Sequence, residues 1–461
     1  MTATPSPASI HTSADDFMLR LRQRTPGELE FHQAVEEWYE SIHRLLDRRP
    51  AYQRMKIAEQ MVEPERVITF RVTWEDDQGA IHVNRGYRVQ MNSALGPFKG
   101  GLRFHPSVNL SVLKFLAFEQ VSKNALTRLP LGAGKGGADF DAKGRSDREV
   151  MRFCQAFMNE LHRHIGPDTD VPAGDIGVGG REVGYMFGQY KKLQNQVHGA
   201  ITGKGPDWGG SLLRPEATGY GLVYFASEMM RTLGQEISGK TCLVSGSGNV
   251  AQFTIEKLLQ LGARPVTVSD SGGYIYDEAG IHADKLAFIK KLKNEERGRI
   301  QAYADVYPEA VYTARDPSLG YNPLWRHRAD LALPCATQNE LNGIDAQHLV
   351  DGGVVIVAEG ANMPCTAEAI DIFHQHGIRY APGKAANAGG VAVSGLEMAQ
   401  NGSRLPWSAE EVDRRLYGIM CGIHQMCLET AEAHGEKGRY ALGANIAAME
   451  RIAGAMLALG I

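Results

Sequence analysis

The stretch Thr241-Cys-Leu-Val-Ser-Gly-Ser-Gly-Asn-Val-Ala251 decides the fold of this chain. Residues 242–245 form a short apolar run that predicts a buried strand, and residues 252–261 predict a helix. Between them, the pattern Gly-x-Gly-x-x-Ala predicts a turn whose backbone can approach a pyrophosphate at the helix N-terminus. Such a pattern also occurs in ordinary tight turns. Its position between a strand and a helix therefore carries the prediction of a dinucleotide site.

Outward from this turn, the second half of the chain alternates short apolar runs with helical stretches. The runs are Thr241 to Ser245, Pro265 to Ser269, Ala329 to Leu333, Val354 to Ala358 and Ile378 to Ala381. This alternation predicts an α/β fold with a Rossmann-like, doubly wound parallel sheet over residues 209–435. The candidate cofactor residues in its first turn are Gly246, Ser247, Gly248, Asn249 and Val250.

The choice of dinucleotide depends on the end of the next strand, roughly 20 residues further on, where such folds meet the adenine ribose. Asp270 stands there, and an acid at this position favours NAD because it holds the ribose hydroxyls. Ser271 can donate a hydrogen bond, and Lys293 on the following helix can reach a 2′-phosphate, which favours NADP. The alternative is that Lys293 is only a solvated helix residue.

Residues 1–208 have a different pattern, which predicts a mixed α/β domain. Helical spacing is found at 15–24, 28–48, 109–128, 147–164 and 181–195. Apolar and polar residues alternate around the turn at 76–79, which predicts a hairpin with one buried face. Its apolar positions are Ile68, Phe70, Val72, Trp74, Ile81, Val83, Tyr87, Val89 and Met91. Two final helices, about 408–435 and 442–459, have no strand to cover, so the segment 436–461 is expected to return to the first domain.

Composition narrows the classes of partner. The 461 residues are 43% hydrophobic and 22% charged with a formal net charge of −4, which gives no general attraction to nucleic acid or to an anionic membrane. The six cysteines are scattered in apolar runs, as in reduced thiols of a cytoplasmic protein. The N-terminal Met1 to Ser9 lacks the pattern of a signal sequence, and no stretch has roughly 18 consecutive apolar residues, so we expect a cytoplasmic protein.

Three segments of the first domain set a lysine among glycines or small residues: Lys99, Lys123 and Lys135. Such neighbours leave room around an ammonium and let the backbone press against a ligand, and an enclosed ammonium has a lowered pKa. Several converging lysines predict an anionic substrate such as a dicarboxylate. A phosphate-loop interpretation of Gly134-Lys135 fails, because Leu129 and Gly136 stand where that motif needs Gly and Ser or Thr. Structural turns are the remaining alternative.

Asp175, in Pro-Ala-Gly174-Asp-Ile-Gly177, is a second ionisable group framed by glycines. A carboxylate beside a lysine of low pKa would form an acid/base pair, whereas a turn or capping role is the plainer alternative. Cys421-x-x-His424-x-x-Cys427 has the spacing of half a metal site, but it lies in a helical pattern with no second ligand pair, so no metal is expected.

These residues resemble one family, the hexameric small-subunit glutamate dehydrogenases, particularly the NADP-dependent members. The matching stretches span most of the chain and are Asn92 to Ser107, Leu131 to Gly137, Asp168 to Gly180, Arg214 to Gly221, Gly246 to Ala251 and Pro382 to Glu397. The resemblance implies reversible reductive amination of 2-oxoglutarate with ammonium to L-glutamate, with a hydride exchanged between Cα and the nicotinamide of NADP(H). It also implies a cytoplasmic homohexamer in which residues 1–208 bind substrate and form the oligomer.

The resemblance further implies a role for each matching residue. Lys135 would be the catalytic lysine, and Asp175 would carry the proton to and from the amino group. Lys99 and Ser394 would hold the side-chain carboxylate, while Lys123, Gln120 and the backbone of Gly174 would hold the α-carboxylate. Thr218 and Asn249 would contact the cofactor, and Asn362, Asn387 and Val391 would line the cleft between the domains.

Two other hypotheses stay open. One is an NAD-preferring, catabolic glutamate dehydrogenase or another amino-acid dehydrogenase on the same fold, although Lys99 and Ser394 favour glutamate over apolar substrates. The other is a non-catalytic regulator that senses a dinucleotide. That hypothesis predicts damage among the chemical residues, whereas Lys135, Asp175, Lys99 and Ser394 are all present.

Overall fold

A computed structural model describes residues 14–461 of the chain, which form two compact units. The first unit contains residues 14–121, 131–200 and 448–461, and the second contains residues 122–130 and 201–447. The domain limits expected from the sequence, at 208/209 and about 436, stay a prediction, while the described structure changes unit at Ala200 and at Ala447. The segment Met1 to Ser9, where a signal sequence was not expected, lies outside the described residues.

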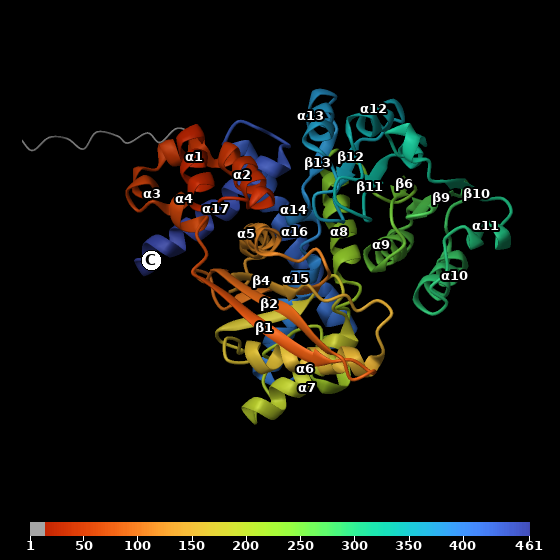
Figure 1. Cartoon of the computed structure of the whole chain (residues 1–461). Helices are drawn as coiled ribbons and strands as arrows, with labels where there is room; N and C mark the ends of the chain where they lie inside the picture. The colour runs from red at the N-terminus through yellow and green to blue at the C-terminus, as the bar shows by residue number, and fades with distance from the viewer. Residues whose placement is uncertain (1–13) are drawn as a thin grey trace, which may run out of the picture. The chain divides into compact units, whose positions relative to one another are not determined.

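The first unit is built around a five-stranded mixed sheet with the order β1-β2-β4-β3-β5. In Figure 1, helix α5 covers one side of this sheet, and α6 and α7 lie together on the other. The strands are β1 Arg66–Glu75, β2 Ile81–Asn92, β3 Phe98–Phe104, β4 Ala133–Ala138 and β5 Asp170–Gly174. The helices are α1 Ala14–Arg24, α2 Leu29–Arg48, α3 Pro50–Arg54, α4 Ile57–Met61, α5 Leu110–Leu126, α6 Asp147–Leu161 and α7 Gly180–Gln194.

Helix α6 shows how local sequence fixes an element. The Ser146 hydroxyl accepts from the Glu149 backbone N–H at 3.1 Å, and the Glu149 carboxylate accepts from the Ser146 N–H at 2.8 Å. This capping box pairs two backbone donors that the helix cannot pair itself, which stabilises a helix start by about 1 kcal/mol. Behind it, Phe153 and Phe157 pack on Phe104 of β3 with ring centroids 5.0 and 5.2 Å apart.

The predicted hairpin is present, but its buried face is only partly the expected one. On β1, Val72 and Trp74 are buried between exposed residues, as expected. On β2, Ile81 and Val83 are 63% and 66% exposed. The register pairs Trp74 with His82, so His82 shares the buried face with Trp74, and its neighbours Ile81 and Val83 point to the other face. From residue 86 onward, β2 lies between β1 and β4 and is buried on both faces, which hides the alternation there.

The glycine-rich lysine segments are strands rather than loops at two of three places. Lys99 lies in β3 and Lys135 in β4, while Lys123 lies on α5. Glycine has a low intrinsic strand propensity, so the sequence around Lys99 and Lys135 does not predict a strand. Here close neighbours exclude side chains: a Cβ on Gly136 would lie 2.6 Å from the Tyr87 carbonyl oxygen.

The second unit contains the predicted parallel sheet, with the order β13-β12-β11-β6-β7. Its strands are β6 Thr241–Val244, β7 Arg264–Pro265, β11 Leu331–Leu333, β12 Ile356–Ala358 and β13 Arg379–Ala381. Helices α12 Gly343–Asp351 and α13 Ala367–Gln375 cover one face, where Leu349 and Phe373 are buried with Val357. The predicted fold class, a mixed α/β domain followed by a domain built on a doubly wound parallel sheet, is confirmed.

The apolar run 265–269 was expected to be one parallel strand, and this prediction was wrong. It divides into β7 and β8 Thr267–Asp270, and β8 belongs to a three-stranded antiparallel sheet with β9 Gly273–Tyr276 and β10 Val311–Ala314. The Thr267 hydroxyl accepts from the Val244 N–H at 2.8 Å and donates to the Val244 carbonyl at 2.9 Å, so β8 contacts β6 through this side chain, while its backbone pairs with β9.

The remaining helices of the second unit are α8 Ala217–Thr232, α9 Asn249–Gln260, α10 Ala283–Asn294, α11 Ala302–Val306, α14 Gly383–Ala386, α15 Gly389–Ser403 and α16 Ala409–Ala433. Short 3-10 turns occur at η1 Pro206–Trp208, η2 Pro317–Leu319 and η3 Pro323–Arg326. The last helix, α17 Tyr440–Leu459, begins in the second unit and enters the first at Ala448.

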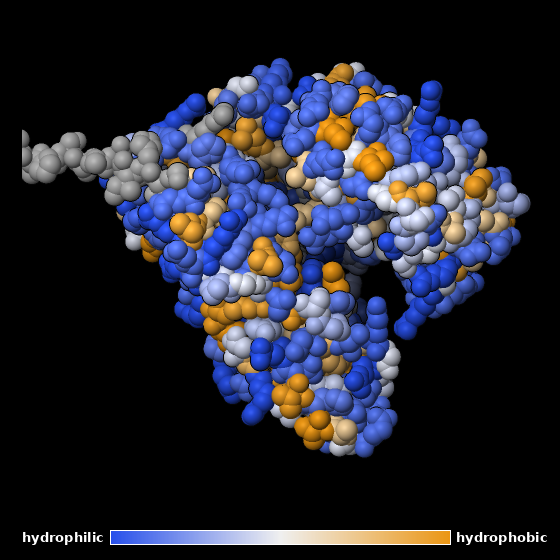
Figure 2. Space-filling model, turned by 45° about the horizontal axis from the view of Figure 1, so that its top comes forward, coloured by the Kyte–Doolittle hydropathy of each residue, from blue (hydrophilic) through white to orange (hydrophobic). Residues whose placement is uncertain are grey.

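Among the described residues, α17 is the one helix long and apolar enough to cross a membrane by length and composition. Of its most apolar window, 56% is buried inside the structure, and a core helix passes the same test. On the molecular face in Figure 2, apolar side chains form small separate patches among polar ones.

Candidate functional site

Lys135 and Asp175 form a buried ion pair in the first unit. The Lys135 Nζ lies 3.0 Å from Asp175 Oδ2, and the side chains are 7% and 19% exposed. Lys135 comes from β4, and Asp175 follows the last residue of β5, Gly174. The structure therefore brings together two residues that the sequence singled out separately as an acid/base pair.

Arg103 is a third member of this cluster and was not predicted from the sequence. Its Nε donates to the same oxygen, Asp175 Oδ2, at 3.1 Å. Burial lowers the pKa of Lys135, and the charges of Arg103 and Arg88 lower it further, while Asp175 opposes them. Burial would raise the pKa of Asp175, but the Lys135 and Arg103 cations lower it to about 2. The result is a lysine whose pKa lies below its ordinary value beside a carboxylate that stays ionised.

Lys99 lies on the same side of the sheet as this cluster. Lys99, Gly101 and Arg103 are alternate residues of β3, so they share one face. A Cβ on Gly101 would lie 2.8 Å from Asp175 Cβ and 3.3 Å from Lys135 Nζ. Gly101 therefore leaves room around the Lys135 ammonium, as the glycine neighbours in the sequence predict. Lys99 itself is only 1% exposed.

Gln120 and Gly174 lie at the edge of the same cluster. Gln120, on α5, is partly buried, and a Cβ on Gly100 would lie 3.4 Å from its Cγ. Gly174 pairs with Leu102 of β3, and a Cβ there would lie 2.5 Å from the Val178 carbonyl oxygen. Glycine at 174 is thus required by the packing of the chain.

Lys123, Asn362 and Asn387 form a hydrogen-bonded row in the second unit. Lys123 Nζ donates to Asn362 Oδ1 at 3.1 Å, and Asn387 Nδ2 donates to the same oxygen at 3.2 Å. Asn387 Nδ2 also donates to the carbonyls of Gly360 and Ala361, at 3.1 and 3.0 Å. The buried Asn387 Oδ1 has no hydrogen-bond partner in the structure, so it can accept from a donor on a ligand.

Ser394, on α15, is hydrogen-bonded to Arg214, which lies just before α8. Ser394 is 1% exposed, and its hydroxyl accepts from Arg214 Nε at 3.1 Å. A Cβ on Gly390, one turn before Ser394, would lie 2.7 Å from Thr218 Oγ1 and 3.5 Å from Arg214 Nη1. Val391 lies on the same helix and is partly buried. Arg214 and Ser394 are 180 residues apart in the chain, so no local pattern could have linked them.

The glycine turn after β6 has the geometry that dinucleotide binding needs. Gly246 has a positive φ of 82°, and a Cβ there would lie 3.0 Å from the Cys335 carbonyl oxygen. A Cβ on Gly248 would meet nothing within 4 Å, so the packing of the protein does not require this glycine, whereas a closely approaching phosphate would. The Ser269 hydroxyl accepts from the Gly246 N–H at 2.7 Å, which joins the turn to β8.

The neighbouring residues of the turn follow from it. Ser247 is buried, Val250 is partly buried, and Gly248 and Asn249 are exposed at the start of α9. Asn249 Nδ2 donates to the Pro215 carbonyl at 2.6 Å. Because Pro215 lies just before α8, this bond brings Asn249 close to the start of the helix that carries Thr218.

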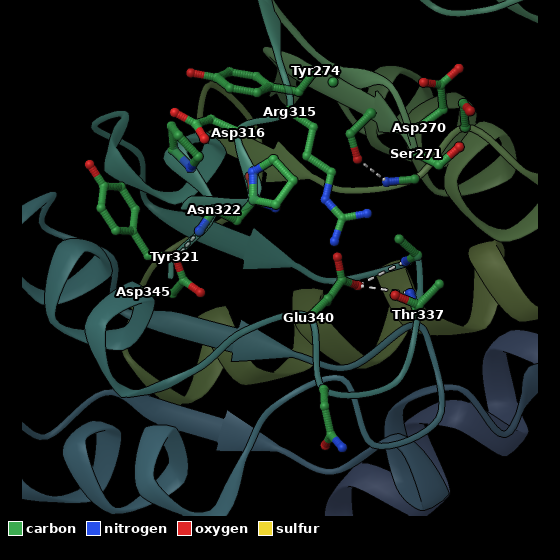
Figure 3. Close-up of a pocket in the computed structure, with 18 of the residues that line it drawn as sticks. Asp270, Ser271, Tyr274, Arg315, Asp316, Tyr321, Asn322, Thr337, Glu340 and Asp345 are labelled. Carbon is green, nitrogen blue, oxygen red and sulfur yellow. Dashed lines mark hydrogen bonds between the residues drawn. The ribbon is translucent and has the colours of Figure 1, made fainter. Parts of the chain in front are cut away.

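A pocket of about 640 Å³ opens beside this turn. Its lining includes Gly246 to Gly248, the segment 269–271, Arg315, and Glu340 from the loop after β11. Figure 3 shows the Arg315 guanidinium pointing into the pocket between the segment with Asp270 and Ser271 and the carboxylate of Glu340. Burial raises the pKa of the Glu340 carboxyl to about 7. The backbone N–H groups of Ala336 and Thr337 donate to this carboxylate and lower the pKa, but by less than burial raises it.

The Asp270 carboxylate is already engaged by the protein. Its Oδ1 accepts from the Gly272 N–H at 2.9 Å, and its Oδ2 accepts from Lys293 Nζ at 3.1 Å and the Ile300 N–H at 2.9 Å. Burial would raise the pKa of Asp270, but these donors lower it below its ordinary value. Lys293 is thus no freely solvated helix residue. Arg299, not predicted from the sequence, donates to Ser271 Oγ at 2.6 Å.

The half metal site expected to be empty has ordinary packing contacts. His424 Nε2 is 3.0 Å from the Tyr440 hydroxyl, and Cys427 is fully buried. Over residues 14–461, no group of three or more His, Cys, Asp or Glu side chains is arranged to hold a metal ion. All six cysteines are free thiols, as expected.

Comparisons with known proteins agree with this architecture. The sequence model of the Glutamate/Leucine/Phenylalanine/Valine dehydrogenase family matches residues 209–460, and that of the Glu/Leu/Phe/Val dehydrogenase dimerisation domain matches residues 64–192. The chain is 57% identical over 448 residues to an NADP-specific glutamate dehydrogenase of Giardia intestinalis, which covers 97% of this chain and 98% of that protein.

Two further matches are similar. An NAD(P)-specific glutamate dehydrogenase of Xylanibacter ruminicola is 56% identical over 448 residues, which is 97% of this chain and 99% of that protein. The crystal structure of a Plasmodium falciparum glutamate dehydrogenase matches with a TM-score of 0.94 at 50% identity, over 97% of this chain and 94% of that chain. The Giardia protein is named as NADP-specific and the Xylanibacter protein as NAD(P)-specific, so these two relatives differ in the dinucleotide that their names state.

Proposed function

Since the chain belongs to the Glu/Leu/Phe/Val dehydrogenase family, we propose that it is an NADP-dependent glutamate dehydrogenase. It reversibly converts 2-oxoglutarate and ammonium to L-glutamate, and NADPH, when bound, supplies the hydride. The observation that carries the proposal is the buried cluster of Lys135, Asp175 and Arg103, because a lysine of lowered pKa beside an ionised carboxylate suits proton transfer at a carbonyl carbon.

Lys135 is the catalytic lysine in this proposal. Protonated, it donates to the carbonyl oxygen of 2-oxoglutarate as ammonia adds, and neutral, it takes a proton from water in the reverse direction. Asp175 carries the proton to and from the amino group. Its depressed pKa keeps the carboxylate ionised at neutral pH, which is the form that can accept a proton.

The substrate carboxylates are held by cations at two ends. Lys99 and Ser394 bind the side-chain carboxylate, while Lys123, Gln120 and the backbone of Gly174 bind the α-carboxylate. Arg214 supports the first of these roles, because its bond to Ser394 Oγ holds that hydroxyl in one orientation and adds a positive charge beside it. Asn387 and Val391 line the substrate pocket, and the unpartnered Asn387 Oδ1 accepts from the ligand.

The cofactor is NADP(H), held at its pyrophosphate by the turn from Gly246 to Val250, with Thr218 and Asn362 beside its nicotinamide half. Three observations support a 2′-phosphate site at Ser271. The Asp270 charge is offset by Lys293, its oxygens are occupied by protein donors, and Arg299 adds a guanidinium at Ser271. An acid engaged in this way is poorly placed to accept from a ribose diol, and the adjacent cations suit a phosphate.

Initial rates of 2-oxoglutarate amination with NADPH and with NADH at equal concentration test the function. We expect a strong preference for NADPH. Arg299→Ala is expected to lower kcat/KM for NADPH roughly 10- to 150-fold and to leave that for NADH unchanged, since one charge-assisted hydrogen bond is worth about 1.5–3 kcal/mol. Equal or better use of NADH would make this a NAD-preferring enzyme governed by Asp270. The absence of any rate with either cofactor would instead support the hypothesis of a non-catalytic regulator that senses a dinucleotide.

The substrate assignment has its own test. The double variant Lys99→Leu with Ser394→Val replaces a cation and a hydroxyl by apolar groups, so we expect preference to move from 2-oxoglutarate toward apolar 2-oxo acids. The measurement is kcat/KM for a series of 2-oxo acids. A double variant that still favours 2-oxoglutarate would remove the distal-carboxylate role from both residues.

The chain is proposed to assemble as a cytoplasmic homohexamer that assimilates ammonium. The match of residues 64–192 to a dimerisation domain supports self-association. So do Val67, Ile81 and Val83, which are 40%, 63% and 66% exposed on one face of the β1–β2 hairpin, at the edge of the sheet. Six free cysteines are usual in a reducing compartment.

A further inference from the structure

Behind the strands that carry Lys99 and Lys135 lies a fully buried ion pair, Arg88 with Asp170. Arg88 Nε and Nη2 donate to the two oxygens of Asp170 at 2.9 and 2.5 Å, and both side chains are 0% exposed. Arg88 comes from β2 and Asp170 from β5, the two strands that flank β4 and β3. The Arg88 side chain therefore crosses behind both lysine-bearing strands.

The register of the sheet places this pair on the face opposite Lys135. In the antiparallel pairing of β2 with β4, Arg88 stands opposite Gly136 and Val89 stands opposite Lys135. Directly opposed residues share a face and neighbours along a strand alternate, so Arg88 and Lys135 point to opposite sides. Arg88 thus has no place in direct contact with substrate on the Lys135 side, although it touches the same two strands.

The glycines beside Lys135 make the crossing possible. A Cβ on Gly134 would lie 3.3 Å from Arg88 Nη2, and a Cβ on Gly136 would lie 3.0 Å from Arg88 Cδ. On β3, the Gly100 carbonyl, next to Lys99, accepts from Arg88 Nη1 at 3.1 Å. Part of the glycine pattern around the lysines therefore accommodates an arginine behind the sheet, rather than a ligand in front of it.

The remaining polar atoms of the pair are also satisfied. Gln90, two residues along β2 on the Arg88 side, donates from Nε2 to Asp170 Oδ2 at 3.0 Å and to the His164 carbonyl at 3.1 Å. The fork of a guanidinium on a carboxylate fixes both side chains in one geometry, which a lysine cannot do. A buried pair of this kind contributes little to stability compared with apolar packing, so its geometry and field need another explanation.

We propose that Arg88 is a positioning residue for catalysis, braced by Asp170, which holds β3 and β4 so that Lys99 and Lys135 meet the substrate, and which sets the electrostatic field behind Lys135. This inference rests on the catalytic role proposed for Lys135. The charged groups that act on Lys135 come from three directions: Asp175 after β5, Arg103 on β3, and Arg88 on β2.

The field gives the proposal a signature that a purely structural role lacks. Glutamate oxidation needs neutral Lys135 to take a proton from water, so the acidic limb of the rate profile follows the pKa of Lys135. Arg88→Met removes a positive charge behind the ammonium, which raises the pKa of Lys135 and moves the limb to higher pH. Asp170→Asn leaves that positive charge unbalanced, which lowers the pKa and moves the limb to lower pH.

The experiment is kcat/KM for L-glutamate against pH, with saturating NADP+ and the full-length enzyme, for the wild type, Arg88→Met, Asp170→Asn and Arg88→Lys. We expect opposite shifts of roughly half a pH unit for the first two variants. Arg88→Lys keeps the charge but loses the fork, so its limb should stay near that of the wild type while kcat/KM falls about tenfold through misplacement of the lysines. Titration of the substrate is common to all four proteins and cancels in the comparison.

Lys114→Met is the matched control, because Lys114 forms a buried pair with Glu28 at 2.6 Å in the same unit but away from β3 and β4. Its acidic limb and kcat/KM should equal those of the wild type, even if its thermal midpoint falls. Folded Arg88→Met and Asp170→Asn proteins whose limbs move together, or not at all, would overturn the proposal. Should Arg88→Met fail to fold, the isosteric Asp170→Asn decides alone, and an unshifted limb contradicts the proposal.

Failure of the site assignment itself would look different. If Lys135→Ala kept wild-type turnover, the catalytic role of Lys135 would be wrong, whatever the Arg88 variants did. If Lys135→Ala is inactive and the Arg88 and Asp170 variants keep the wild-type rate and profile, only the positioning role fails.

Discussion

At the scale of single residues, one carboxylate oxygen organises the chemistry. Asp175 Oδ2 is 3.0 Å from Lys135 Nζ and 3.1 Å from Arg103 Nε. Because two cations share this oxygen, removal of any one of the three charges changes the electrostatic environment of the other two, and Lys135 and Asp175 each shift the pKa of the other. The consequence is that mutations here act on rate and on pH dependence together.

Lys135→Ala is expected to abolish turnover, with a loss of at least about 10²–10⁴-fold in kcat, because it removes the proton donor and acceptor. Cofactor affinity should stay nearly unchanged, since the glycine turn and the Asp270 pocket lie in the other unit. The measurements are steady-state kcat and titration of NADPH fluorescence. Lys143→Ala, at an exposed position, is the control and should behave as the wild type. Weak NADPH binding by Lys135→Ala would contradict the assigned role.

Asp175→Asn tests the electrostatic coupling. The carboxylate raises the pKa of Lys135, so its loss lowers that pKa, and the acidic limb of the residual activity should move to lower pH. The rate should fall as well, because the proton carrier is gone. An acidic limb that instead moved to higher pH would show that Lys135 is not the group that titrates there.

The same carboxylate links stability to acid. The folded pKa of Asp175, about 2, lies below its ordinary value of 3.8. Its contribution to the free energy of unfolding is therefore complete above about 3.8 and is lost as pH falls toward 2. Above pH 5, protonation of Asp175 contributes nothing to changes in either activity or stability.

At the scale of elements, helices α8 and α15 approach through glycines. A Cβ on Gly389 would lie 1.9 Å from the Ala217 carbonyl oxygen, and a Cβ on Gly221 would lie 2.9 Å from Gly389 Cα. Helix α15 carries Ser394 and Val391, so this contact fixes the helix that presents them. No side chain fits between the two backbones.

Gly389→Ala is therefore expected to destabilise the fold by about 1–3 kcal/mol, because α15 must move away from α8. It should also raise KM for 2-oxoglutarate, since Ser394 moves with the helix. Thermal unfolding and steady-state kinetics measure the two effects. Gly418→Ala on α16 is the control: that glycine is exposed, and a Cβ there meets nothing within 4 Å. It should stabilise by about 0.5–1 kcal/mol, and a destabilisation equal to that of Gly389→Ala would refute the steric argument.

The sequence predicted the elements that have a strong period or a strong local pattern. Helices α1, α2, α5, α6 and α7 begin and end within a few residues of the expected limits, and β6 leads through Gly246 into α9 as expected. Strands β3 and β4 were not predicted, because their glycines have little strand propensity and owe their conformation to neighbouring strands. The antiparallel sheet of β8, β9 and β10 was missed, since a short apolar run does not show whether its neighbour is parallel or antiparallel, and β10 lies far along the chain from β9.

The candidate site divides in the same way. The resemblance to the dehydrogenase family is confirmed, and Lys135 with Asp175, Lys123 with Asn362 and Asn387, and Asp270 with Lys293 lie together in the structure. The roles of these residues stay predictions. The arginines were missed. Arg88 and Asp170 are 82 residues apart, and an arginine in an alternating strand gives no sign that it is buried.

At the scale of the whole molecule, the exposed apolar face of the β1–β2 hairpin is the feature a single chain does not explain. Ile81→Asp with Val83→Asp places two charges on this face, so we expect the assembly to separate into smaller species by sedimentation or light scattering. Val306→Asp, at a position 52% exposed on α11, is the control and should leave the assembly intact. An unchanged mass of the assembly for the double variant would show that the subunits contact one another through another face.

The cysteines give the molecule an unreactive background for labelling. Burial raises the pKa of all six thiols, that of the least buried, Cys421, to about 11, so almost none is thiolate at neutral pH. Maleimides and haloacetamides react through the thiolate, and the native chain should consume them slowly. One cysteine introduced at an exposed position of each unit would then react selectively with a thiol-reactive fluorophore. Pairs of such labels would report the distance between the two units while cofactor and substrate bind, without removal of a single native thiol.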